Sequence, residues 1–335
     1  MDAAGRENRK MKSLAVSFAP MEGITGRIFR KIFDKHFKGI TDYYTPFITP
    51  KEKRGLDKKD IKELSSENNE GIKIIPQILT NSAEAFNLAA EKLIGLGYKE
   101  INLNLGCPSG TVVNKGRGSG ALKALDSLEK LLTSIYNQAE NTNLKISIKT
   151  RIGYENAEEF VDILSLYKKF PFEKLIIHPR TRMEFYKGGV HKESFALALK
   201  ECLKTGNTDR LCYNGEINTI ADIKKLNEEF PEIEHIMIGR GLLRYPFLIE
   251  GILERDDINR KVRLKNYLDE LFSAYLEEFN GSPVAVLKMK ELWYYIKESF
   301  ERYEDYIKMI QKAKDAAEYR AAVNVIFSNC YVKQL

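Results

Sequence analysis

Short β-rich runs alternate with longer amphipathic stretches eight times between residues 14 and 255. The eight runs are Leu14–Phe18, Asp42–Thr45, Lys73–Ile78, Glu100–Asn104, Lys145–Lys149, Lys174–His178, Leu211–Tyr213 and His235–Ile238. Several of them, such as IKIIPQI and KLIIH, are almost continuously apolar and rich in β-branched residues, which is typical of parallel strands buried on both faces. Eight consecutive strand–helix units predict an α/β fold, a (β/α)8 TIM barrel over residues 14–255. An open, doubly wound sheet is the structural alternative.

The pattern changes at residue 256. From there to residue 335 the sequence has helical periodicity with one break near residues 280–283, which predicts an all-helical C-terminal domain. Lys288, Lys290 and Lys297 lie there beside aromatic residues. Such a run is most often a solvated helix face, and binding of an anionic partner is the other interpretation. Residues 1–13 are polar and contain a second methionine, so we expect an N-terminal arm or a tag.

Composition excludes several classes of protein. A hydrophobic content of 43% argues against intrinsic disorder. No apolar run approaches the ~18 residues that span a membrane, and no secretory signal is recognisable. The cysteines Cys107, Cys202, Cys212 and Cys330 form no C-x-x-C pair and have no nearby histidine, so we expect neither disulfides nor a metal site. These features favour a soluble, cytoplasmic protein, which we expect to be a monomer. Its net charge of +6 permits a polyanionic partner without requiring one.

In a TIM barrel the chemistry lies at the carboxyl ends of the strands, and seven of the eight runs here lead into polar residues or glycines. Lys149 ends an apolar run and needs an anion, because an unpaired buried ammonium is unfavourable. A reduced flavin would supply that negative charge. His178 is either a ligand contact or a core histidine. Asn214-Gly215 and Gly239-Arg240-Gly241 follow the last two strands, where many barrels bind phosphate, although glycines also form tight turns there.

Cys107 follows a strand in a Gly-Cys-Pro turn, ahead of a glycine-rich loop. A lone cysteine is usually a small buried hydrophobic residue. In this position, however, a thiol with a pKa of ~8.5 would stay protonated at neutral pH and could donate a proton. We therefore predict that Cys107 is a general acid.

Several motifs together resemble the tRNA-dihydrouridine synthase family. They are Ala-Pro-Met-Glu-Gly-Ile-Thr at 19–25, Asn-Leu-Asn-Leu-Gly-Cys-Pro-Ser at 102–109, Lys-Thr-Arg-Ile-Gly at 149–153, His-Pro-Arg-Thr-Arg at 178–182, Tyr-Asn-Gly at 213–215 and Met-Ile-Gly-Arg-Gly at 237–241. The resemblance extends from residue 14 to the C-terminus. The Gly-Cys-Pro and His-x-Arg-Thr segments, in this order and at this separation, are a combination specific to that family.

The resemblance implies an FMN-containing barrel with a C-terminal helical domain, residues 256–335, that helps to hold tRNA. The residues it places at the cofactor are Ala19, Pro20, Met21, Gln77, Lys149, His178, Asn214, Gly215, Glu216, Gly239 and Arg240. It places Asn104, Arg151 and Tyr186 at the target uracil and makes Cys107 the catalytic acid. Glu216 and Gly26 stand where the family often has aspartate, and Arg117 stands where a small residue is usual.

The implied reaction reduces the C5–C6 double bond of a uridine in tRNA to 5,6-dihydrouridine. Reduced FMN would give a hydride to C6, Cys107 would protonate C5, and NADPH would reduce the flavin again. The target base must be extruded from the folded RNA to reach the barrel. Two alternatives are another FMN barrel oxidoreductase, similar to dihydroorotate dehydrogenase, and a non-catalytic RNA-binding module.

Overall fold

The computed structural model of the chain describes residues 14–253 and 259–333. The predicted N-terminal arm, residues 1–13, and the predicted domain boundary between residues 255 and 256 lie outside the described residues. Within the described part of the chain, no helix combines the length and the apolar character needed to cross a membrane.

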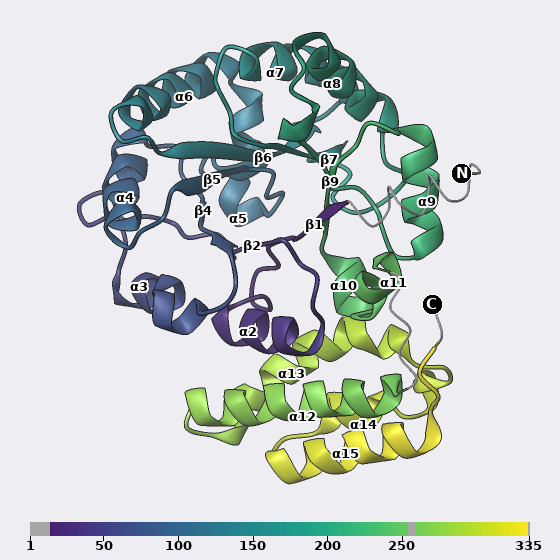
Figure 1. Cartoon of the computed structure of the whole chain (residues 1–335). Helices are drawn as coiled ribbons and strands as arrows, with labels where there is room; N and C mark the ends of the chain where they lie inside the picture. The colour runs from purple at the N-terminus through teal and green to yellow at the C-terminus, as the bar shows by residue number, and fades with distance from the viewer. Residues whose placement is uncertain (1–13, 254–258, 334–335) are drawn as a thin grey trace.

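A single parallel sheet forms the centre of residues 14–253. Its strands are β1 (Ala15–Phe18), β2 (Asp42–Tyr44), β3 (Ile74–Ile75), β4 (Gln77–Ile78), β5 (Glu100–Leu105), β6 (Lys145–Gly153), β7 (Leu175–Thr181), β8 (Leu211–Tyr213) and β9 (His235–Ile238). They pair in the order β3-β2-β1-β9-β8-β7-β6-β5-β4. Because only Pro76 separates β3 from β4, the two ends of this order meet and the sheet closes into a barrel (Figure 1). The predicted TIM barrel is confirmed.

Two details of the strands differ from the prediction. The expected run Lys73–Ile78 is divided into β3 and β4, because Pro76 has no N–H to donate to a neighbouring strand. In addition, β6 and β7 continue beyond their predicted ends at Lys149 and His178. Residues two apart on a strand share a face, so this extension decides which side chains point into the barrel.

Helices surround the sheet (Figure 1). They are α2 (Arg27–His36), α3 (Lys58–Leu64), α4 (Ala83–Gly95), α5 (Gly110–Val113), α6 (Leu125–Glu140), α7 (Phe160–Tyr167), α8 (Lys192–Thr205), α9 (Ile220–Glu229), α10 (Arg240–Arg244) and α11 (Leu248–Ile252). Short 3₁₀ turns occupy Ser66–Asn69, Gly118–Lys123, Ala157–Glu159, Thr208–Arg210, Lys297–Ser299 and Tyr303–Asp305. In α6, Leu128, Leu131, Leu132 and Ile135 are buried at the i, i+3, i+4, i+7 spacing of an amphipathic helix.

The hydrophobic core has two parts. A large cluster fills the space between the sheet and the helices and continues into the C-terminal region. A smaller cluster lies inside the barrel and consists of Ala19, Tyr44, Ile75, Ile176, Cys212 and Met237. The barrel is therefore packed through its middle layer, and space for a ligand is left at its carboxyl end.

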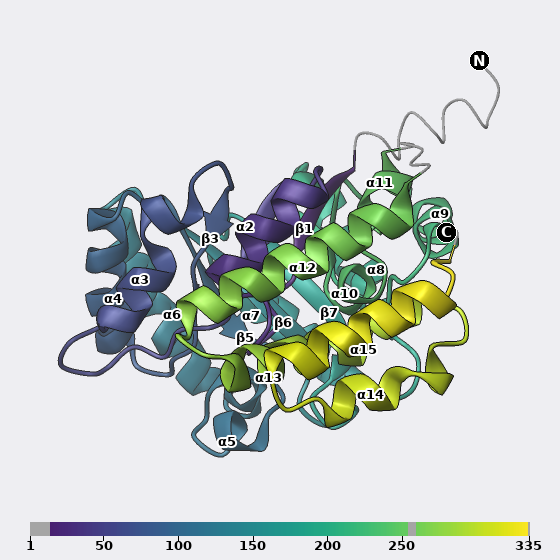
Figure 2. The same cartoon turned by 90° about the horizontal axis from the view of Figure 1, so that it is seen from below.

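The C-terminal region is helical, with α12 (Arg260–Glu278), α13 (Ser282–Ile296), α14 (Ile307–Lys312) and α15 (Ala316–Asn329). It lies against one side of the barrel, and α12 crosses α2 (Figures 1 and 2). Tyr267 of α12 is fully buried, with ring centroids 6.5 Å from Phe29, 6.0 Å from Phe33 and 5.1 Å from Phe37. This aromatic contact fixes the helical region beside the barrel.

Candidate active site

A cavity of about 260 Å³ opens at the carboxyl ends of the strands. It is lined by Pro20, Met21, Glu22, Pro46, Phe47, Gln77, Asn104, Gly106, Cys107, Pro108, Lys149, Arg151, His178 and Tyr186. The structure therefore brings together the predicted acid, the three predicted uracil contacts and five of the predicted flavin contacts.

The register of β5, β6 and β7 explains why polar side chains from distant segments meet here. Asn104 of β5 pairs with Lys149 of β6, and Arg151, two residues further on, pairs with His178 of β7. Lys149 and Arg151 share one face of β6, and His178 shares a face of β7 with Arg180. The extension of both strands thus adds Arg151 and Arg180 to Lys149 and His178 at the mouth of the barrel.

The electrostatics of the site are dominated by cations. Burial, reinforced by the charge of Arg151, lowers the pKa of Lys149 to about 8. Lys149 makes no hydrogen bond to another of the described residues, and its ammonium therefore faces the cavity without a carboxylate partner. Burial also lowers the pKa of His178 well below its usual range, and the nearby cations Arg151, Lys149, Arg180 and Arg240 lower it further, so its imidazole is neutral at pH 7.

One carboxylate offsets part of this charge. Glu216 accepts from Arg180 at 2.6 Å and from Arg240 at 3.1 Å. Arg180 is 1% exposed and also donates to the carbonyl of Gly188 at 2.8 Å. The remaining positive charge near His178 favours an anionic ligand in or beside the cavity.

The thiol of Cys107 lies in the wall of this cavity. Burial raises its pKa above the ordinary value of 9.0, and the thiol is therefore protonated at neutral pH. The loop that carries it is held closely: Ser119 donates its backbone N–H and its hydroxyl to the carbonyl of Cys107, at 3.1 and 2.9 Å. Gly118 has a φ of +57°, and a Cβ there would lie 2.8 Å from the same carbonyl oxygen. This position of the loop requires glycine.

A chain of amide side chains leads from the loop into the barrel. Asn104 accepts the backbone N–H of Cys107 at 2.9 Å and donates to Gln77 at 2.7 Å. Gln77 donates to Asn102 at 2.7 Å, and Asn102 donates to Ser147 at 3.0 Å. Each of these four side chains is buried, and its orientation is fixed by its neighbours in the chain.

Tyr186 lies between two guanidinium groups at the edge of the cavity. The centroid of its ring is 5.4 Å from the guanidinium carbon of Arg151 and 4.7 Å from that of Arg240. Its ring centroid is also 6.0 Å from that of His178. With 49% of its surface exposed, Tyr186 can contact a ligand that enters from solvent.

Six of the predicted cofactor contacts do not line the cavity. Ala19 belongs to the cluster inside the barrel, and Asn214 donates to the carbonyl of Met237 at 2.8 Å. Gly215, Glu216, Gly239 and Arg240 follow β8 and β9, on the side of the mouth where Arg180 is paired. A Cβ on Gly239 would approach the Cβ of Ala19 to 3.1 Å, so glycine keeps this turn close to the barrel wall.

Other residues at the site were not predicted. Pro46 and Phe47 line the cavity, although the end of β2 was the one strand end without polar residues or glycines. Glu22 also lines it, and burial raises the pKa of its carboxyl group. Arg180 is buried within the His-Pro-Arg-Thr-Arg motif, where its alternation with His178 was a usable signal.

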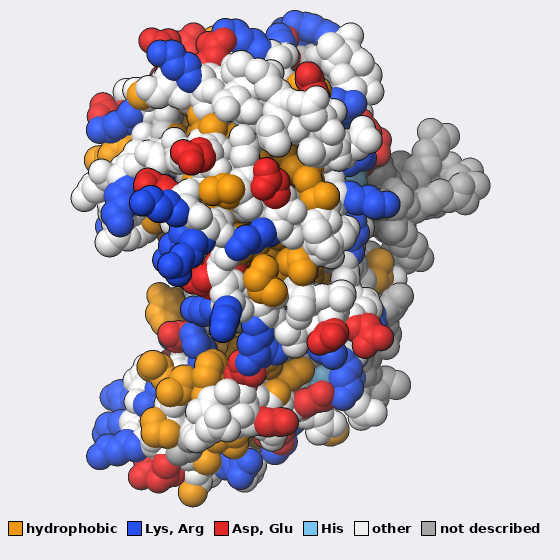
Figure 3. Space-filling model, turned by 90° about the vertical axis from the view of Figure 1, so that its left-hand side faces the viewer, with side chains coloured by type: hydrophobic (Ala, Val, Ile, Leu, Met, Phe, Trp, Pro, Cys, Tyr) orange, Lys and Arg blue, Asp and Glu red, His pale blue; other side chains and the backbone are white. Residues whose placement is uncertain are grey.

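The C-terminal helices reach the same end of the barrel. Lys288 of α13 donates to the backbone carbonyl of Gly23 at 2.8 Å and pairs with Glu291 at 3.0 Å, so it anchors α13 to the barrel instead of extending freely into solvent. A groove of about 340 Å³ separates barrel and helices here, on the face shown in Figure 3. Trp293, expected beside the lysines, is 1% exposed and donates to the hydroxyl of Tyr319 at 3.0 Å.

No group of three or more histidine, cysteine, aspartate or glutamate side chains is placed to hold a metal ion within the ranges that the structure describes.

Comparison with known proteins identifies the family. The model for dihydrouridine synthase matches residues 17–331. The probable tRNA-dihydrouridine synthase 2 of Bacillus subtilis is 29% identical over 234 residues, which are 69% of this chain and 70% of that protein. The probable tRNA-dihydrouridine synthase of Helicobacter pylori is 30% identical over 290 residues, 83% and 82% of the two chains. Among solved structures, morphinone reductase aligns with a TM-score of 0.49 at 11% identity, over 72% of this chain and 87% of that one. Because the family match covers nearly the whole chain, the resemblance seen in the motifs is confirmed, and this protein belongs to the dihydrouridine synthase family.

Proposed function

We propose that the protein reduces specific uridines of tRNA to 5,6-dihydrouridine, with FMN as its cofactor, NADPH as the electron donor and Cys107 as the general acid. The observation that carries this proposal is that Cys107 and Lys149 line one cavity at the barrel mouth, and that Lys149 has no carboxylate partner among the described residues. Membership of the dihydrouridine synthase family and the names of the relatives support uridine in tRNA as the substrate.

The residues at the mouth fit an anionic, flat cofactor. Lys149 would compensate negative charge on a reduced flavin ring, and Gln77 would hydrogen-bond its polar edge. Ala19, Pro20, Met21 and neutral His178 would surround the ring, whereas Asn214, Gly215, Gly239 and Arg240 would hold the ribityl chain and the phosphate. Glu216 would act mainly by orienting Arg180 and Arg240, because its carboxylate accepts from both. Bound FMN, reduced by NADPH, would supply the hydride that adds to C6 of the uracil.

Cys107 would complete the reduction by protonating C5. A general acid has to carry its proton at working pH, and the raised pKa of the buried thiol meets this condition. Asn104 would contact the uracil while holding the backbone of Cys107, so that substrate and acid share one support. Arg151 donates to the carbonyls of Gly106 and Thr181 at 3.0 and 2.7 Å, which fixes its guanidinium beside Tyr186 for contact with the same base.

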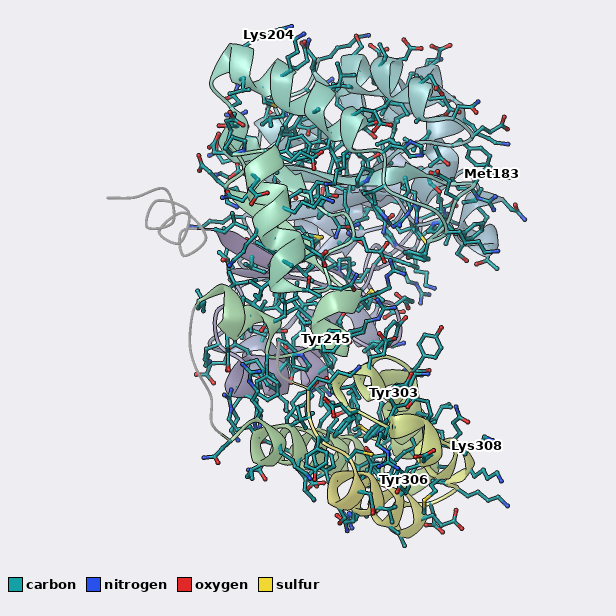
Figure 4. The ribbon with its side chains drawn as sticks, turned by 90° about the vertical axis from the view of Figure 1, so that its right-hand side faces the viewer. Met183, Lys204, Tyr245, Tyr303, Tyr306 and Lys308 are labelled. Carbon is teal, nitrogen blue, oxygen red and sulfur yellow. The ribbon has the colours of Figure 1, made fainter. Side chains whose placement is uncertain are left out.

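The RNA would have to present its target outside the base stack. Extrusion of a nucleotide costs a few kcal/mol of stacking and pairing, which contacts elsewhere on the RNA must offset. The helical region, residues 256–335, would provide such contacts through exposed lysines. Figure 4 shows Lys308 extending from this region on the side of the molecule where Met183 marks the edge of the barrel.

The test is to map dihydrouridine by mass spectrometry in tRNA from cells that lack the gene and from cells in which it is restored. We expect specific uridines to lose the mass of two hydrogens in the deletion strain and to regain it on complementation. The purified protein should be yellow, and NADPH should bleach its flavin absorbance. An unchanged dihydrouridine map would refute the proposed substrate, and a colourless protein that does not take up FMN would refute the cofactor.

A further inference from the structure

The loop that follows β7 exposes large apolar side chains next to the proposed active site. Met183 is 54% exposed, Phe185 39% and Tyr186 49%. Met183 lies at the outer edge of the barrel in Figure 4. Tyr186 also lines the cavity, so the exposed patch and the cavity are continuous. An exposed apolar patch beside a ligand site often marks a surface that binds a ligand or another macromolecule.

Cations alternate with rings where this loop meets the turn Gly118–Lys123 and the segment after β6. The ammonium of Lys123 is 4.1 Å from the ring centroid of Tyr154. The guanidinium carbon of Arg182 is 5.4 Å from the centroid of Tyr154 and 4.9 Å from that of Phe185. Within the described residues, neither Lys123 nor Arg182 forms an ion pair with a carboxylate. Their charges are therefore available to an anion that approaches the rings.

The backbone of the loop holds Phe185 in an unfavourable conformation. Its φ is +52°, in the left-handed region that bulky residues rarely adopt. The loop is tied down on both sides of it: Glu184 accepts the backbone N–H of Thr181 at 2.6 Å, and Arg180 donates to the carbonyl of Gly188 at 2.8 Å. Backbone strain of this kind is often found at functional sites, so the exposed ring of Phe185 suggests a role in binding.

A nucleotide matches this arrangement chemically. Its base offers a flat apolar face to an aromatic ring, and its phosphate offers negative charge to a lysine or an arginine within a few ångströms. Extrusion of the target base into the cavity would leave the neighbouring base with one face unstacked. The neighbouring base would then pass the edge of the cavity, where Tyr186 leads to Phe185.

We propose that Met183 and Phe185 form a stacking platform for the base next to the target uridine, with its phosphates held by Arg182 and Lys123. This inference rests on the proposed function, because it concerns the nucleotide beside the one that is reduced. It assigns the loop after β7 to recognition of RNA, separately from the C-terminal helices.

The experiment compares wild-type protein with Phe185→Gly and Met183→Ala on a tRNA transcript whose target uridine has been mapped. Phe185→Gly removes the ring and also relieves the positive φ, so we expect its melting temperature to equal or exceed that of wild type. Loss of the stacking contact with one base typically lowers the affinity for the nucleic acid by roughly 5- to 150-fold. We expect kcat/KM for dihydrouridine formation to fall within that range, through KM, with FMN content unchanged.

Two controls isolate the stacking. Leu203→Ala removes an exposed apolar side chain of α8, 49% exposed, and should leave kcat/KM unchanged. Two further transcripts each carry one abasic residue. In one it lies directly 5′ of the target uridine, and in the other directly 3′ of it. On the transcript that lacks the stacked base, wild type and Phe185→Gly should have the same kcat/KM.

Equal activity of wild type and Phe185→Gly on intact tRNA would overturn the platform. A defect of Phe185→Gly that persists unchanged on both abasic transcripts would overturn it as well, since the ring would then act on the protein itself. In either case wild-type protein would still form dihydrouridine. If wild type forms none on any tRNA, the proposed function and the platform both fail.

Discussion

The side-chain oxygen of Asn104 accepts the backbone N–H of Cys107 at 2.9 Å, while its nitrogen donates to Gln77 at 2.7 Å. One buried amide thus connects the loop that carries the thiol to the strand end that offers the proposed flavin contact. The distance between acid and cofactor would be set by a short chain of neutral groups, whose orientation does not change with pH in the physiological range. The charged groups of the site would then be left to bind the proposed ligands.

Replacement of Cys107 by alanine should strongly slow dihydrouridine formation with little effect on the binding of FMN and tRNA. A general acid accelerates a reaction roughly 10²- to 10⁴-fold, so we expect kcat to decrease by at least a factor in that range. Flavin content and tRNA affinity should stay at wild-type values, measured by absorbance and by filter binding. Turnover at the wild-type rate would exclude the thiol as the acid.

Ionisation of the Cys107 thiol should not reduce the activity at mildly alkaline pH. Burial raises the pKa of Cys107 above 9.0, and the acid form is therefore lost only when the pH rises past that raised value. The rate of uracil reduction by pre-reduced enzyme should be independent of this group from pH 7 to pH 8. A rate that falls between pH 7 and pH 8 in wild type, but not in Cys107→Ser, would contradict the prediction.

Replacement of Lys149 by methionine should stabilise the ligand-free protein and weaken flavin binding. The pKa of Lys149 is about 8 in the folded chain against an ordinary 10.5, so below pH 8 the folded state carries an unfavourable ammonium. This penalty disappears as the pH rises from 8 to 10.5, where the unfolded chain binds more protons. Because the ammonium faces an open cavity, we expect a gain of about 1–2 kcal/mol at pH 7 in denaturant melts, less than the full shift of the pKa implies.

Flavin affinity gives the second measurement for Lys149. In wild type it should decrease between pH 7 and pH 9.5, as the ammonium loses its proton, and in Lys149→Met this part of the pH dependence should be absent. Fluorescence titration of FMN at the two pH values checks both proteins. Equal pH dependence in the two would show that Lys149 does not hold the cofactor.

Replacement of Glu216 by glutamine should destabilise the barrel mouth. Removal of one partner of a buried ion pair can cost about 3–5 kcal/mol, but Glu216 is 37% exposed and Arg180 keeps its bond to Gly188, so we expect about 1–2 kcal/mol. Burial alone would raise the pKa of Glu216, but the hydrogen bond from Arg180 and the charges of Arg240 and Arg244 together outweigh burial and lower the pKa below 4.5. The stability difference should therefore be present above pH 4.5 and shrink as the pH falls through the lowered pKa. A constant difference down to pH 3 in urea melts would contradict it.

Charge reversal at Lys297, Lys308 and Lys312 together should weaken tRNA binding while FMN content stays the same. Lys297 packs its ammonium 5.3 Å from the ring of Tyr294 and 5.5 Å from that of Tyr303, and the other two lysines are exposed on α14. If each neutralises one phosphate, the slope of log K against log salt should decrease by about 2–3. Lys204→Glu, on the far side of the barrel in Figure 4, serves as the control. Identical slopes for triple variant and wild type would remove these lysines from the RNA interface.

The barrel was predictable because its strands are buried on both faces and therefore stand out as apolar runs. Pro76 was visible in the sequence. Whether a proline interrupts a strand depends, however, on whether the adjacent strand has a carbonyl that would accept the N–H that proline lacks, and the sequence does not show this. The continuation of β6 to Gly153 and of β7 to Thr181 was not predictable from these runs, since Arg151 and Arg180 are polar residues at strand positions. The burial of Arg180 becomes reasonable only when Glu216, thirty-six residues further on, is seen to pair with it. The burial of Arg151 depends on the carbonyls of Gly106 and Thr181, which accept from its guanidinium.

The candidate site could be predicted where a motif has an unusual chemical composition, as at Cys107 and Lys149. Phe47 was missed because a single aromatic residue after a strand has no distinctive pattern. Lys288 was assigned to a free cationic face, whereas the fold turns it toward the carbonyl of Gly23, on a segment 265 residues away. Contacts of this kind depend on how the helical region is seated, which local periodicity does not encode.

The bond from Lys288 to Gly23 joins α13 to the turn directly after Met21 and Glu22, both of which form the wall of the cavity. A displacement of α13 would also move this bond, and with it the turn that carries two residues of the cavity wall. The seating of the C-terminal helices and the shape of the cavity are therefore mechanically linked in this protein.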